Sequence, residues 1–128
     1  MSIRLENMLT PKQLAGYRAG WLEQKKKKEQ ELQARYQKAI TLAYKAAEHL
    51  KQNYQCQVFL FGSLLEKEKF MEHSDIDIVI ANLDSEINFW RVYAEVMNIL
   101  HPFDFDLIEL ERIDPEVRGY ILQKGLEL

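Results

Sequence analysis

The apolar positions of this chain change their spacing near residue 57, and the change divides the sequence into two parts. Between residues 32 and 54 they recur every three or four residues, as on one face of an amphipathic helix. Thr10, Pro11 and Gln13 give this helix a start signal, because threonine caps a helix, proline suits its first position and glutamine completes a capping box. We therefore expect a helix from about residue 10 to about Asn53.

After residue 56 the pattern becomes that of short strands separated by helices. The predicted strands are 57–61, 75–81 and 103–110. Asn88 opens a helix that ends at His101, and Asp114 caps a short helix that ends near Gly125. This order predicts an α/β (α+β) fold, in which a small mixed sheet has helices packed on one side.

The composition is that of an ordinary globular protein, with 47% hydrophobic and 29% charged residues among 128. No apolar stretch is long enough to span a bilayer, and the N-terminus lacks the pattern of a signal peptide. The single cysteine, Cys56, excludes an intrachain disulfide and a cysteine-based zinc site. We expect one domain in a cytoplasmic protein.

The formal net charge of −3 conceals an uneven distribution along the chain. Residues 1–56 carry eleven Lys or Arg against five Glu, and residues 57–128 carry six against fifteen Asp or Glu. Glutamates flank the lysine run 25–28, which indicates a solvated helix face. The acidic part suits metal cations better than a polyanion, so direct nucleic-acid binding is not expected.

Carboxylates gather on two of the predicted strands. Asp75 and Asp77 share one face of a strand, and Asp104 and Asp106 share one face of another. If these strands are neighbours, the carboxylates converge and repel one another unless a divalent cation lies between them. Ligands that are all oxygen favour Mg²⁺ or Mn²⁺, and carboxylates that bridge two such ions are typical of phosphoryl-transfer sites.

Gly62 and Ser63 follow the first predicted strand and supply a complementary feature. Glycine lets the backbone approach a phosphate closely, and serine offers a hydroxyl and a backbone N–H. Alone, each feature is weak evidence. Their combination along the chain is much more specific. It consists of a strand that ends in Gly-Ser, a spacer of eleven residues, an Asp-x-Asp motif in a second strand, and a third strand that also carries Asp.

That combination resembles the polymerase β nucleotidyltransferase superfamily and, at this size, its minimal nucleotidyltransferase group. The resemblance covers roughly residues 57–125 and implies that family's fold, with a catalytic core over 57–128 and a helical extension over 1–56 in a single domain. By resemblance, Asp75, Asp77 and Asp106 hold two Mg²⁺ ions, and Gly62 and Ser63 hold the β and γ phosphates of ATP, the substrate.

The chain departs from the family pattern just after Gly-Ser. The family often has an arginine there, whereas this chain has Leu64 and Leu65, so Lys67, with Lys69, is expected to supply the charge that binds the nucleotide. Glu109 aligns with a second acidic position, but alternation puts it on the face opposite Asp106.

The resemblance also implies a partner. Minimal nucleotidyltransferases often pair with helical HEPN proteins, which are RNase toxins, and transfer AMP from ATP to a tyrosine hydroxyl of the toxin. We therefore expect a protein adenylyltransferase that acts as the antitoxin of a type VII-like pair and forms a hetero-oligomer with its toxin. Two alternatives stay open: a nucleotidyltransferase for a small molecule such as an aminoglycoside, and a catalytically idle antitoxin that neutralises by binding.

Overall fold

The computed structural model describes residues 9–128 of the chain. Contacts within it separate two units, one ending at Ala34 and one comprising Arg35–Leu128. The helix α1 (Pro11–Tyr54) contributes to both units. The compact unit therefore includes the C-terminal part of the helix that the sequence assigned to an extension.

The start of α1 has the predicted capping box. The Gln13 backbone N–H donates to the Thr10 hydroxyl at 3.1 Å, and the Thr10 N–H donates to the Gln13 side chain at 3.0 Å. The prediction of this helix start is thus confirmed. Up to Ala34 nearly all side chains of α1 are exposed, and no helix in the described part of the chain is apolar enough over sufficient length to cross a membrane.

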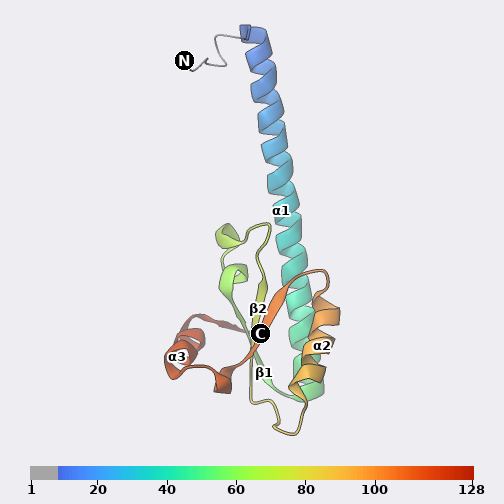
Figure 1. The fold of residues 1–128 in the computed structure, drawn as a ribbon, viewed down its shortest axis with the longest axis vertical. Coiled ribbons are helices and arrows are strands. Elements are labelled where there is room, and N and C mark those ends of the chain that lie inside the picture. The colour runs from blue at the N-terminus through green and yellow to red at the C-terminus, as the bar shows by residue number, and fades with distance from the viewer. Residues whose placement is uncertain (1–8) are drawn as a thin grey trace. The chain divides into compact units, whose positions relative to one another are not determined.

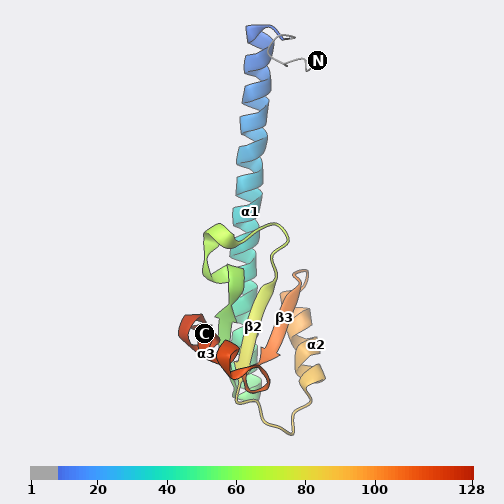
Figure 2. The same ribbon diagram turned by 60° about the vertical axis from the view of Figure 1, so that its left-hand side comes forward.

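Four strands form a mixed sheet in the order β3-β2-β1-β4 (Figures 1 and 2). They are β1 (Gln57–Phe61), β2 (Ile76–Ala81), β3 (Phe105–Glu109) and β4 (Leu126–Glu127). β1 pairs antiparallel with β2 and β4, whereas β2 and β3 are parallel. The helix α2 (Phe89–Leu100) supplies the crossover that parallel neighbours require. The predicted mixed sheet is confirmed. The sequence did not predict β4, because a strand of two residues is too short to show an alternating pattern.

The two faces of the sheet are covered differently. Ile76, Ile78 and Ile80 are fully buried and, by strand alternation, point away from Val79, which packs with Ile121 of α3 (Pro115–Lys124). The helices α1 and α2 lie on that side of the sheet (Figure 1). On the opposite face Ile121 packs with Phe59 and other residues of β1 and β2. The expectation of helices on one side therefore holds for α1 and α2 and is wrong for α3 (Figure 1).

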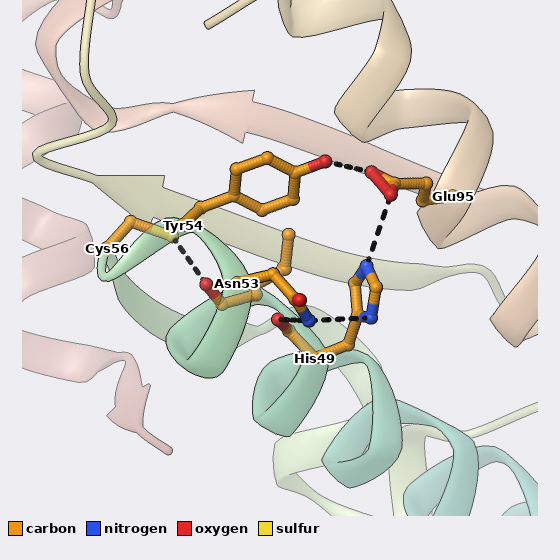
Figure 3. Close-up of polar contacts among 6 residues, drawn as sticks. His49, Asn53, Tyr54, Cys56 and Glu95 are labelled. Atoms are coloured by element: carbon orange, nitrogen blue, oxygen red, sulfur yellow. Dashed lines mark hydrogen bonds and ion pairs between the residues drawn. The ribbon is translucent and has the colours of Figure 1, made fainter.

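Polar contacts join the end of α1 to α2 (Figure 3). The Tyr54 hydroxyl donates to one carboxylate oxygen of Glu95, and His49 Nε2 lies 3.6 Å from the other. Asn53 donates to the His49 carbonyl at 2.8 Å. Burial and the hydrogen bond to Glu95 raise the pKa of Tyr54 above its usual value of 10.0. Glu95 is thus the common acceptor of this helix–helix contact.

Glu95→Ala is expected to lower the free energy of unfolding by about 1–2 kcal/mol, because the partly buried Tyr54 hydroxyl loses its acceptor. Since the folded-state pKa of Tyr54 is raised, this stabilisation is present at neutral pH and lost as the pH rises beyond 10.0. Urea unfolding at pH 7 measures the effect, with the exposed Asn98→Ala on the same helix as control. Equal losses in the two variants would contradict a stabilising role for Glu95.

Candidate active site

The turn after β1 brings the backbone against a carboxylate. Gly62 has φ +82°, in the left-handed region that favours glycine, and begins a 3-10 turn over Gly62–Leu65. A Cβ atom at position 62 would overlap Oδ2 of Asp77. Two independent constraints, backbone conformation and close approach, therefore require glycine at this position.

Asp77 and Asp106 lie side by side on the parallel strands β2 and β3. The pairing register places them opposite each other, on the face that also carries Phe61. The pKa of Asp77 is raised from 3.8 to about 6, first by burial, then by the charge of Asp106, a hydrogen bond with Asp106 and the charge of Asp75. The strands β2 and β3 are neighbours, which is the condition under which their carboxylates converge, and negative charge is concentrated at this point.

The other acidic candidates precede the strands β2 and β3 or lie at the end of β3. Asp75 is exposed, one residue before β2, and its charge contributes to the raised pKa of Asp77. Asp104 is exposed and precedes β3, where its carbonyl accepts from the Ile76 N–H at 3.0 Å. Glu109 pairs in register with Ile80, away from Asp106, and its carboxylate contacts Arg112.

The carboxylates have the chemistry of a Mg²⁺ site. Among residues 9–128 no three Asp, Glu, His or Cys side chains are grouped as a complete ligand set. Asp77 and Asp106 nevertheless supply adjacent oxygen donors. Burial is the main cause of the raised pKa of Asp77, and the negative charges of Asp106 and Asp75, which add to it, are charges that a cation at this point would neutralise. The two carboxylates therefore fit a divalent metal ion as a pair of ligands, and Asp75 is not grouped with them as a third.

A groove of about 790 Å³ begins at the Gly-Ser turn. Gly62 and Ser63 line it, and so do Lys69 and, from α3, Lys124. Lys67, the lysine favoured by the sequence, is exposed and is not among the lining residues. No local sequence signal pointed to Lys124, because it reaches this turn only through the packing of α3 on the sheet.

The chain matches the model of the family described as "Polymerase beta, Nucleotidyltransferase" over residues 45–128. Two crystal structures of mutants of the toxin–antitoxin complex MntA–HpeT contain similar chains. One is 26% identical with a TM-score of 0.51, covering 66% of this chain and 69% of that one. The other is 20% identical with a TM-score of 0.51, covering 66% and 70%, and supports the fold alone. Comparison with curated proteins gives no match.

Proposed function

Because this chain belongs to the polymerase β nucleotidyltransferase family, we propose that it transfers AMP from ATP to a hydroxyl group of a partner toxin. The acceptor in this proposal is a tyrosine of a HEPN-type helical toxin, and the chain acts as its antitoxin. The observation that carries the proposal is that Gly62, Asp77 and Asp106 meet at one end of the neighbouring strands β1, β2 and β3.

The residues at this end of the strands have complementary roles in the proposed reaction. The acceptor hydroxyl oxygen forms a bond to the α-phosphorus of ATP, pyrophosphate leaves, and the hydroxyl proton passes to solvent. Gly62 lets the backbone approach the phosphates, and Ser63 offers them its hydroxyl. Two Mg²⁺ ions held by Asp75, Asp77 and Asp106 would supply electrostatic stabilisation of the charge that develops on phosphate.

The proposed partner is a toxin because the chain that is 26% identical comes from a toxin–antitoxin complex. The exposed aromatic side chains of the chain add support for a protein partner. Trp21 is 61% exposed and Trp90 is 70% exposed, and tryptophan is enriched where proteins bind one another.

The test is intact-mass analysis of the small protein that co-purifies with the chain, before and after addition of ATP and Mg²⁺. We expect the partner to gain whole AMP units with the wild-type chain and none with Asp75→Asn/Asp77→Asn. Asp84→Asn is the matched control, because Asp84 is exposed and lies outside the site, and transfer should persist. A partner that binds without gaining mass would contradict AMP transfer, and modification by the double variant would contradict the assigned site.

A further inference from the structure

We infer that Lys69 and Lys124 together bind the triphosphate of the nucleotide, in place of the arginine that the chain lacks after Gly-Ser. The inference rests on the proposed function and adds to it two binding residues from separate elements. Lys69 belongs to the 3-10 turn Lys67–Lys69, and Lys124 is the last residue of α3. Both line the groove that begins at Gly62 and Ser63.

The position of Lys124 is fixed by packing on both sides of it. Ile121, three residues earlier, is buried against the sheet, and the Gly125 N–H donates to the Ile121 carbonyl at 2.6 Å. Leu126 then pairs with Leu60 of β1. Because the chain is held before and after Lys124, the backbone at this position is kept beside the groove that Lys124 lines.

A second contact holds α3 next to the Gly-Ser turn. The ring of Tyr120 meets the ring of Phe61 edge-on, with centroids 5.6 Å apart. Phe61 is the residue before Gly62, so this contact ties α3 directly to the strand end that carries the turn. Both aromatic residues line the groove with the two lysines, and the proximity of Tyr120 adds slightly to the raised pKa of Lys69.

Lys69 already has an anionic partner that a phosphate can replace. Its Nζ lies 3.0 Å from Oε2 of Glu66, and the hydrogen bond and charge of Glu66 raise the pKa of Lys69. Both side chains are more than half exposed, and such an ion pair in water is weak. A triphosphate carries several negative charges and outcompetes one screened carboxylate, so Glu66 acts as a competitor that lowers nucleotide affinity.

The inference keeps Lys69, which the sequence named beside Lys67, and puts Lys124 in the place of Lys67. Lys67 and Lys69 belong to the same short turn, but only Lys69 lines the groove. Substituting them separately therefore compares the two assignments within one element. Lys45, exposed on α1, provides a lysine-to-alanine control away from the groove.

The test is isothermal titration of the full chain with a non-hydrolysable ATP analogue and Mg²⁺, with AMP as a second ligand. Lys69→Ala and Lys124→Ala should each raise the Kd for the analogue about tenfold, because each variant loses one charge-assisted contact with the triphosphate. Lys124→Arg should retain affinity, Glu66→Gln should lower the Kd a few-fold, and Lys45→Ala should change nothing. The Kd for AMP should stay constant in all of these variants, because AMP lacks the β and γ phosphates.

The possible results separate this inference from the proposed function. If the wild-type chain binds the analogue but Lys69→Ala and Lys124→Ala leave its Kd unchanged, the inference is overturned and the proposed function stands. If only Lys67→Ala weakens binding, the sequence-based assignment replaces this one. If the wild-type chain binds neither ligand, the proposed function fails and the inference fails with it.

Discussion

Asp77→Asn is expected to make the chain more stable at pH 7 while it abolishes nucleotidyl transfer. Asp77 is partly buried beside Asp106, and burial together with the charges of Asp106 and Asp75 raises its pKa from 3.8 to about 6. At pH 7 the folded chain must therefore carry an unfavourable charge at this position. Asparagine has a similar shape and no charge, so it removes this cost but also removes a proposed metal ligand.

The sign of the pH dependence follows from the raised pKa. Between pH 3.8 and about 6 the folded chain keeps a proton on Asp77 that the unfolded chain has released. Its free energy of unfolding therefore falls as the pH rises through this window, and the full cost is present above it. A pKa shift of about two units corresponds to a loss of about 3 kcal/mol in the free energy of unfolding. Solvent screening at this partly exposed site reduces the loss to about 1–2 kcal/mol.

Thermal or urea unfolding of both proteins from pH 4 to pH 8 measures this effect. The stability difference between Asp77→Asn and wild type should be near zero at pH 4 and should grow to its full value at pH 7. Mg²⁺ at pH 7 should raise the melting temperature of the wild type and not that of the variant. A difference that is independent of pH, or a variant less stable than wild type at pH 7, would contradict the assigned cause.

The parts of the fold that the sequence predicted are those encoded by neighbouring residues. The capping box of Thr10 and Gln13 depends on four consecutive residues, and it forms as the pattern indicates. Alternation on 75–81 and 103–110 placed Asp77 and Asp106 on defined faces, and a parallel register then brought them together. Local periodicity was sufficient because successive side chains of a strand point to opposite faces of the sheet.

The features that the sequence did not predict arise from contacts between distant segments. The apolar side of α3 is short, and nothing in its spacing indicates which face of the sheet Ile121 covers. Lys124 reaches the Gly-Ser turn only because α3 packs there. Lys67 and Lys69 differ by two positions in a tight turn, and their directions depend on a backbone conformation that composition does not reveal.

Gly62→Ala is expected to be the most destabilising single substitution at the site, at about 2–4 kcal/mol. A left-handed backbone conformation costs an alanine about 1–2 kcal/mol, and φ is +82° here. The new Cβ would also overlap Oδ2 of Asp77, so β2 or the turn must shift. Urea unfolding measures the loss, and Gly119→Ala is the control, because a Cβ there meets nothing within 4 Å and alanine favours the helix.

A double-mutant cycle separates the two causes at Gly62. In an Asp77→Ala background the carboxylate that overlaps the new Cβ is absent, while the cost of the left-handed conformation remains. Gly62→Ala should then cost about 1–2 kcal/mol, with a coupling energy of about 1–2 kcal/mol between the two positions. A coupling energy near zero would show that the turn and Asp77 do not approach each other closely. It would thereby contradict the geometry on which the proposed phosphate and metal sites depend.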